Sequence, residues 1–168
     1  MLSTFQARLA PGVNVSYQPG IYRRTYSGYF GGTTTWFDTA TLTATNKIVG
    51  SIADAAIPTT TSYQFLGYFK APYSETFTFT LASDDKSNLW IGSNAVSGYN
   101  GGNTLIKSNV DTNSNTIVMV AGQLYAVRLQ VGNGPGPGSV SLSVQSSSLA
   151  LTSDLTQLCL FNPNTLGI

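Results

Sequence analysis

The sequence predicts an all-β fold, namely a two-sheet antiparallel β-sandwich or barrel with extended N- and C-terminal arms. Short segments in which apolar and polar residues alternate, such as Phe77–Leu81 and Val140–Val144, recur along the chain. Turns rich in Gly, Asn and Ser separate these segments, which is typical of an all-β domain. No stretch has a long helical period, and no internal repeat is evident, so helical and solenoid folds are disfavoured.

Length and composition restrict the function. The chain has 168 residues, the size of one domain, and only 9% of them are charged, against about 25% in an average protein. A net charge of +1 with no basic patch argues against nucleic-acid binding. Histidine is absent, and the single Cys159 allows no internal disulfide. Flanked by two leucines, Cys159 is expected to be a buried, unreactive thiol.

The chain is expected to divide into three parts. Residues 1–20, with Pro11 and Pro19 among them, are expected to form an extended N-terminal arm. Residues 21–147 form the β domain, and residues 148–168 form a C-terminal tail. The tail is compatible either with one or two helical turns capped by Ser153 or with a returning strand. The start of the chain lacks the pattern of a secretory signal, and no apolar run approaches the length of a membrane span.

Aromatic residues gather near the start of the domain. We expect them to anchor an edge of the core, although their spacing alone leaves open a surface that stacks on sugars. They are Tyr22, Tyr26, Tyr29, Phe30, Trp36 and Phe37.

Asp84 and Asp85 are the only adjacent pair of acids in the chain. They follow the strand expected over Glu75–Leu81 and precede a second apolar run, Leu89–Ile91, which is expected to pair with that strand or with the next one. Two neighbouring carboxylates repel each other unless a cation or hydrogen-bond donors offset their charge. The pair is therefore either a solvated turn, for which Asp and Ser are common, or a site for a cation.

Four segments of the chain together resemble one known family. They are Gly28–Gly32 with Trp36–Ala40, Tyr63–Pro72, Ser83–Gly92 and Tyr125–Asn133. In this order they are similar to segments of the protective-antigen-type domain, especially of its branch in fungal flocculins and GLEYA adhesins. The resemblance spans about residues 21–146 and implies the same β-sandwich or barrel.

The resemblance also implies a calcium site. In adhesin members a cis peptide joins the paired aspartates, which bind one Ca²⁺ ion together with an asparagine and two backbone carbonyls from a later loop. Carried over, the ligands are Asp84, Asp85 and Asn133, with the carbonyls of Pro135 and Pro137. A sugar then completes the shell with two neighbouring hydroxyls. Such a set suits calcium, which takes about six to eight oxygen ligands.

The sequence also departs from the family pattern. Lys86 follows the acids and either competes with a cation or points to solvent. The loops expected to select the sugar, 97–103 and 134–138, are short, and Tyr99 is their only obvious aromatic platform. The cysteines of fungal adhesins are absent.

The leading hypothesis is a non-enzymatic, calcium-dependent carbohydrate-binding module whose partners are a glycan and, through the terminal arms, neighbouring protein subunits. Without an export signal, it is expected on an extracellular surface as part of a particle such as a virion. The alternative is a purely structural capsid or cement protein that uses the same fold without binding sugar. A glycosidase is disfavoured because its two carboxyl groups stand about 5–9.5 Å apart across a cleft, whereas the acids here are adjacent.

Overall fold

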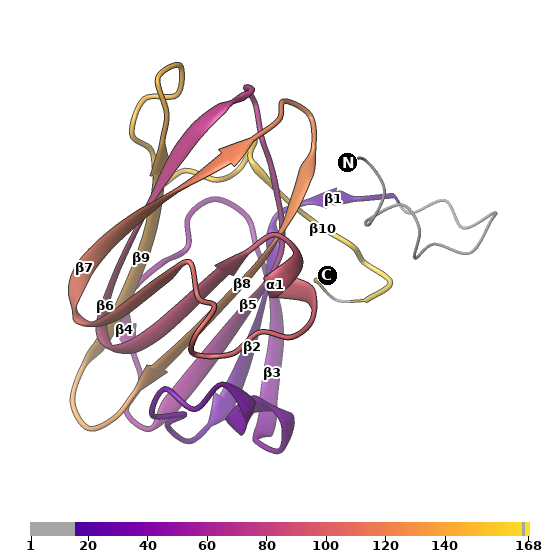
Figure 1. The fold of residues 1–168 in the computed structure, drawn as a ribbon. Helices are drawn as coiled ribbons and strands as arrows, with labels where there is room; N and C mark the ends of the chain where they lie inside the picture. Colours follow the sequence, from indigo (N-terminus) through magenta and orange to yellow (C-terminus); the bar gives the residue numbers. More distant parts are fainter. Residues whose placement is uncertain (1–15, 166) are drawn as a thin grey trace.

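A computed structural model describes residues 16–165, 167 and 168 (Figure 1). Antiparallel strands make up nearly all of the regular structure. A 3₁₀ helix over Thr34–Asp38 and the four-residue helix α1 (Ser93–Val96) are the helices of the described residues. The strands are β1 (Gln18–Pro19), β2 (Ile21–Ser27), β3 (Thr41–Ile48), β4 (Ala53–Ile57), β5 (Thr61–Lys70), β6 (Glu75–Ile91), β7 (Ile106–Met119), β8 (Leu124–Asn133), β9 (Gly138–Gln145) and β10 (Cys159–Phe161).

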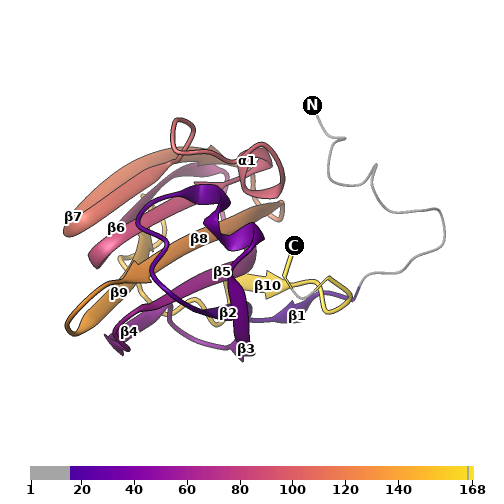
Figure 2. The same ribbon diagram turned by 90° about the horizontal axis from the view of Figure 1, so that it is seen from below.

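All the strands belong to one sheet that curls over into two facing layers (Figure 2). The main strand order is β1-β10-β5-β8-β6-β9-β4, and β2 joins β5 beside β10, β3 joins β2, and β7 joins β6. The long strand β6 takes part in both layers. Its residues 78–83 pair with β9, whereas its residues 87–91 pair with β8. The all-β, antiparallel prediction is confirmed, with the two sheets joined into one curled sheet.

The core lies between the two layers. Alternate side chains of β6 enter it, and Phe77, Phe79 and Leu81 are at most 1% exposed. From the opposite layer, the ring of Phe69 packs edge-on against the rings of Phe77 and Phe79, at centroid distances of 5.6 and 5.2 Å. Each such buried side chain contributes about 1.5–3 kcal/mol to folding.

The outer face of the layer that contains β5 and β8 is also covered. Eight of the ten residues of β5 are buried, which a strand with one solvated face would not show. Two loops provide the cover, the 28–40 loop and the 92–105 loop. Gln130 on β8 donates from Nε2 to the carbonyl of Thr34 in the first loop, and Arg128 donates from Nε to the carbonyl of Ala95 in the second.

The C-terminal tail returns to the sheet. Of its two expected conformations the strand is the one observed, because β10 pairs with β5 through Cys159 and Leu160. Cys159 is buried, as expected, and burial raises the pKa of its thiol to about 12. Most of the expected N-terminal arm lies outside the described residues, and β1 pairs with β10.

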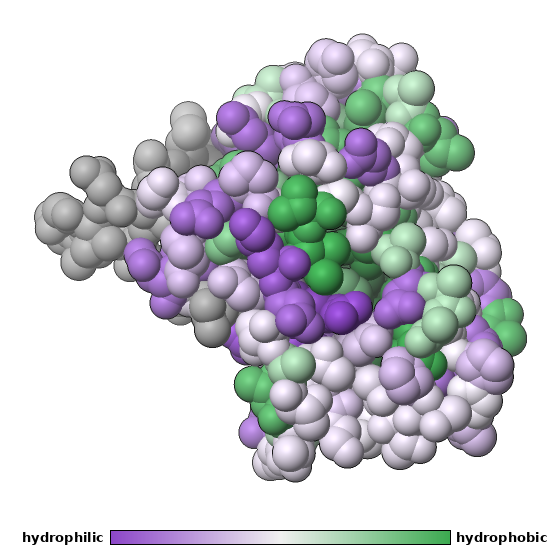
Figure 3. Space-filling model, turned by 180° about the vertical axis from the view of Figure 1, so that it is seen from behind, coloured by the Kyte–Doolittle hydropathy of each residue, from purple (hydrophilic) through white to green (hydrophobic). Residues whose placement is uncertain are grey.

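The surface carries its apolar side chains in small groups. Figure 3 shows separate apolar groups on the face seen from behind, each bordered by more hydrophilic residues. The most exposed large apolar side chains of the described part are Val110, Val118 and Leu151, at 68%, 73% and 65% exposure. Among the described residues, no helix has the length and apolar character needed to cross a membrane.

Candidate functional site

The acid pair lies in a β-bulge inside the continuous strand β6. Ser83 pairs with Asp111 of β7 and Lys86 pairs with Asn109, so Asp84 and Asp85 together face a single residue of β7. Asp85 takes a left-handed backbone conformation with φ of +63°. Two residues opposite one is the definition of a bulge, which bends the strand and re-aims its side chains.

This geometry corrects two expectations. The acids were expected in a connection between two strands, with Leu89–Ile91 pairing either with the strand before it or with the next one. Both segments instead belong to β6, and Leu89–Ile91 pairs with β8. The cis peptide implied between Asp84 and Asp85 is also absent, because every peptide bond of the described residues is trans. The left-handed residue in the bulge supplies the bend that the turn was expected to make.

Two buried serines fix the shape of the bulge. Ser83 Oγ donates to the carbonyl of Asp85 at 2.9 Å, and it lies 2.7 Å from Ser87 Oγ. Ser83 is 6% exposed and Ser87 is 1% exposed. Buried side-chain hydrogen bonds that close on the local backbone hold such a loop in one conformation.

The bulge contacts the connection between β8 and β9. The N–H of Gly134 donates to Asp85 Oδ2 at 2.7 Å, a length typical of a hydrogen bond to a charged acceptor. Asp84 is partly buried beside it, and no hydrogen bond or ion pair joins its carboxylate to the described residues. The structure thus brings together the two segments that the sequence analysis placed in one site.

Asn133 is fully buried at the end of β8. Its amide nitrogen donates to three backbone carbonyls, those of Ile57, Pro58 and Gly136, at 2.8, 3.1 and 3.0 Å. These contacts fix which way the amide points, since only the nitrogen can donate. Its Oδ1 atom is buried and has no partner. An unpartnered buried acceptor costs about 1–3 kcal/mol unless another group occupies the position beside it.

The Gly-Pro segment after Asn133 is partly open to solvent. Pro135 and Pro137 are exposed, and Gly136 between them has a φ of +99°, which favours glycine. The carbonyl that contacts Asn133 is that of Gly136. The role of the Pro135 and Pro137 carbonyls as ligands stays a prediction.

Tyr29 is a residue of this site that the sequence analysis left among the core aromatics. Its ring lies over the connection after β8, since a Cβ built on Gly134 would be 3.7 Å from it. Burial raises the pKa of Tyr29, and the charge of Asp85 raises it further, whereas a hydrogen bond from the backbone of Lys86 lowers it. The core role expected for Tyr26, Phe30 and Phe37 is confirmed, because these three form a buried cluster.

Tyr99, the expected sugar platform, lies elsewhere. Its ring contacts Trp90 at a centroid distance of 5.6 Å and lies 4.1 Å from the guanidinium carbon of Arg128. Arg128 is six residues before Gly134 on an extended strand, a separation of roughly 20 Å at about 3.3 Å per residue. The structure therefore does not bring Tyr99 to the acid pair. Lys86 also turns away, donating from Nζ to the carbonyl of Gly31 at 3.0 Å.

The donor set suits a hard cation. Two carboxylates, an amide oxygen and nearby backbone carbonyls are all oxygen ligands, which calcium prefers. The described residues contain no group of three or more His, Cys, Asp or Glu side chains that could hold a metal ion, so a cation here would depend on amide and backbone oxygens as well as on the two acids. The unpartnered Oδ1 belongs to Asn133, the residue before Gly134, whose N–H contacts the bulge that carries the two acids, and an oxygen of this kind fits an ion of this class.

Comparisons with known proteins agree with this description. Residues 61–146, just over half of the chain, match the GLEYA domain family. This span contains the acid pair, Asn133 and the Gly-Pro segment. No curated protein matches the chain in sequence.

Solved structures share the fold. The epithelial adhesin 6 A domain of Candida glabrata, solved with Galβ1-3GlcNAc, has a TM-score of 0.74 at 18% identity, with 89% of each chain covered. A subtype-switched epithelial adhesin 9 A domain from the same organism, solved with β-lactose, has a TM-score of 0.72 at 12% identity, covering 89% of this chain and 90% of that one. The PA14 domain of the antifreeze protein MpAFP has a TM-score of 0.65 at 11% identity, covering 90% and 95%.

At these identities the likeness establishes the fold alone, which is the one expected from the sequence. The comparisons give no support for display on a virion or for a capsid role.

Proposed function

Because the chain belongs to the GLEYA domain family, we propose that it is a calcium-dependent carbohydrate-binding module whose site is formed by the bulge of β6 and the connection after β8. Asp84, Asp85 and Asn133 would hold the ion, with backbone carbonyls of Pro135 and Pro137 as further ligands. A bound calcium ion supplies open coordination positions for two neighbouring hydroxyls of a sugar.

The orientation of Asn133 is the observation that carries this proposal. Its amide nitrogen is committed to three carbonyls, so its Oδ1 faces away from them without any donor. Replacing this side chain by Asp would remove the donor, and replacing it by an apolar residue would leave three carbonyls unpaired. An asparagine that presents only its oxygen is what a cation site of this kind requires.

The environment of the acids supports the same function. Among the described residues, Asp84 has no hydrogen-bond or ion-pair partner, and only one oxygen of Asp85 is engaged, by Gly134. The charge repulsion between the two carboxylates is therefore little offset by the protein itself, and a divalent ion would offset it. Tyr29 stands at the edge of this site, where its partly exposed ring can stack on a sugar that is held there.

Galactosides are the proposed ligands, since the two adhesin domains of the same fold were solved with Galβ1-3GlcNAc and β-lactose. A module of this kind acts at an extracellular surface. An enzymatic role is not favoured because Asp84 and Asp85 are adjacent in one bulge, whereas the two carboxyl groups of a glycosidase flank the scissile bond.

In the purely structural alternative, the acid pair only stabilises the shape of the bulge. The hydrogen bond that Asp85 accepts from Gly134 would contribute to this role. Binding of Galβ1-3GlcNAc and β-lactose to the 168-residue chain, measured by calorimetry in calcium and again in EDTA, separates the two functions. We expect binding in calcium only, and we expect Asp85→Asn to abolish it. Asp38→Asn, at an exposed acid of the 28–40 loop, is the matched control and should bind normally. Calcium-independent binding, or equal losses in both variants, would contradict the proposal.

A further inference from the structure

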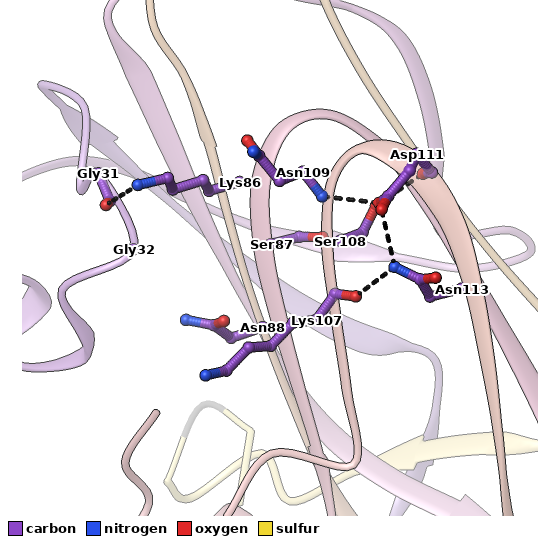
Figure 4. A pocket seen from close by; sticks show the side chains of 10 residues that line it. All are labelled: Gly31, Gly32, Lys86, Ser87, Asn88, Lys107, Ser108, Asn109, Asp111 and Asn113. Atoms are coloured by element: carbon purple, nitrogen blue, oxygen red, sulfur yellow. Dashed lines mark hydrogen bonds between the residues drawn. The ribbon is translucent and has the colours of Figure 1, made fainter. Parts of the chain in front are cut away.

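A cavity lies on the outer face of the sheet, and Lys86, which follows Asp85 in the chain, is one of its lining residues. Its volume is about 390 Å³, within the range of about 300–1,000 Å³ typical of ligand sites. Every lining residue is polar or glycine (Figure 4), and neither the acids, Asn133 nor the Gly-Pro segment contributes to it. Its lining residues are Gly31, Gly32, Lys86, Ser87, Asn88, Lys107, Ser108, Asn109, Asp111 and Asn113.

The register of β6 and β7 explains why these side chains meet. Asn88 is directly opposite Lys107, and Lys86 is directly opposite Asn109. Directly opposed residues share a face of the sheet, and so do residues two apart on one strand, so these four side chains project from the same face. The loops on either side approach them. A Cβ built on Gly32 would lie 3.0 Å from Lys86 Cδ, and one on Gly101 would lie 3.6 Å from Lys107 Nζ.

Donors gather at one end of the cavity. Figure 4 shows the end groups of Lys86, Asn88 and Lys107 extending toward the same side, away from Asp111. Within the described part of the chain, neither lysine is paired with a carboxylate. Asn88 is 5% exposed, and its amide nitrogen is buried without a hydrogen-bond partner. Among the described residues, the Lys107 ammonium group and the Asn88 amide N–H have no hydrogen-bond acceptor, and Lys86 Nζ has one, the carbonyl of Gly31.

At the opposite end of the cavity, the Asp111 carboxylate already has hydrogen-bond partners. Asp111 accepts hydrogen bonds from Ser108 Oγ, from the N–H of Asn109 and from Asn113 Nδ2, at 2.7, 2.8 and 3.0 Å. These bonds, the one from Asn109 first, lower the pKa of Asp111 and keep it ionised. The cavity is thus positive at one end, whereas the other end carries the Asp111 carboxylate, whose charge is offset by three hydrogen-bond donors.

We propose that this cavity is a second carbohydrate subsite, which takes an acidic sugar with its carboxylate or sulfate group between Lys86 and Lys107 and its hydroxyls toward Asn109 and Asn113. That the ligand is a sugar rests on the function proposed above, whereas the preference for an anion rests on this cavity alone. An oxygen of the acidic group would also supply the acceptor that the Asn88 amide lacks.

The test is an NMR titration of the isotope-labelled 168-residue chain in EDTA, which removes any contribution of calcium. The probes are glucuronic acid with glucose as its neutral counterpart, and galactose 6-sulfate with galactose. We expect at least one acidic sugar to saturate shifts at Asn88 and Lys107 and its neutral counterpart to produce none. Which of the two binds identifies the source of the anionic group.

Lys107→Gln should weaken binding of that acidic sugar about tenfold, the effect of losing one charged hydrogen bond. Lys70→Gln, at an exposed lysine at the end of β5, should leave it unchanged. Equal binding of neutral and acidic sugars, shifts confined to Asp84 and Asp85, or equal losses in the two variants would overturn the proposal. Absence of acidic-sugar binding in EDTA would also overturn it and would leave calcium-dependent binding of neutral galactosides intact, so the two proposals fail separately.

Discussion

The 28–40 loop and the 92–105 loop cover the same face of the sheet, yet they have different relations to the candidate site. The first places Tyr29 over the connection after β8, beside Asp85. The second is held by Arg128 and Trp90, both of which contact Tyr99. Both loops are glycine-rich and each carries a partly exposed tyrosine. Their contacts with the sheet, and not their composition, therefore distinguish the loop that lies at the candidate site from the loop that packs away from it.

The largest expected effect concerns the anchor of the 92–105 loop. Arg128→Met removes the hydrogen bonds to the carbonyl of Ala95 and to Gln64 Oε1, leaving two buried acceptors unpaired. We expect a loss of about 2–4 kcal/mol in the free energy of unfolding, measured by chemical denaturation. Lys70→Met, at an exposed position, should change it little. A stable Arg128→Met protein that has lost galactoside binding would reverse the roles of the two loops.

Tyr29→Ala tests whether the 28–40 loop takes part in ligand binding. Removing the ring should lower galactoside affinity about tenfold in calorimetry, because the sugar loses its stacking surface. Calcium affinity should stay the same, since the ring supplies no ligand to the ion. Tyr73→Ala, which removes a tyrosine with 42% exposure elsewhere on the surface, is the control. Unchanged sugar binding in Tyr29→Ala would remove this residue from the site.

Tyr99→Ala should have the opposite effects, lowering the free energy of unfolding and leaving ligand binding unchanged. The variant loses the contact of the ring with the Arg128 guanidinium and its edge contact with Trp90. Together these contacts are worth about 1–2 kcal/mol of unfolding free energy. Galactoside affinity should be unaffected. A loss of affinity without a loss of stability would restore the role that the sequence analysis gave to Tyr99.

The smallest expected effect is a change in titration. The negative charge of Asp85 disfavours the ionised form of Tyr29 and so raises its pKa. A cation bound at the acids offsets that charge, so the pKa of Tyr29 should fall when calcium is added. Tyr68, whose pKa is raised to about 12 mainly by burial beneath the other loop, should not respond. NMR of tyrosine labelled with carbon-13 can follow both, and an equal shift in both would indicate a general effect of the ion.

The strands could be predicted because alternation is a local property of the sequence. Phe77, Phe79 and Leu81 enter the core as their spacing requires, and the same rule places Val140, Leu142 and Val144 there. The path of the chain at the acid pair could not be predicted in this way. Asp and Ser suit both a turn and a bulge, and the choice depends on β7, which pairs with β6 on both sides of this point and keeps β6 extended.

The candidate site, too, could be predicted from the sequence only in part. The resemblance to the GLEYA branch identified Asp84, Asp85 and Asn133 as one group, and the hydrogen bond between Gly134 and Asp85 shows that their segments meet. Tyr29 was missed because it lies more than fifty residues before Asp85, and no local pattern separates it from its buried neighbours Phe30 and Phe37. The unpartnered oxygen of Asn133 depends on three carbonyls, two at the end of β4 and one in the Gly-Pro segment, so only the structure can show it.

A crystal structure of the chain grown with calcium and Galβ1-3GlcNAc tests the central claim most directly. We expect an ion at about 2.3–2.6 Å from oxygens of Asp84, Asp85 and Asn133 Oδ1, with two sugar hydroxyls completing its shell. An ion bound elsewhere, or a filled site in which Asn133 Oδ1 stays unligated, would contradict the account.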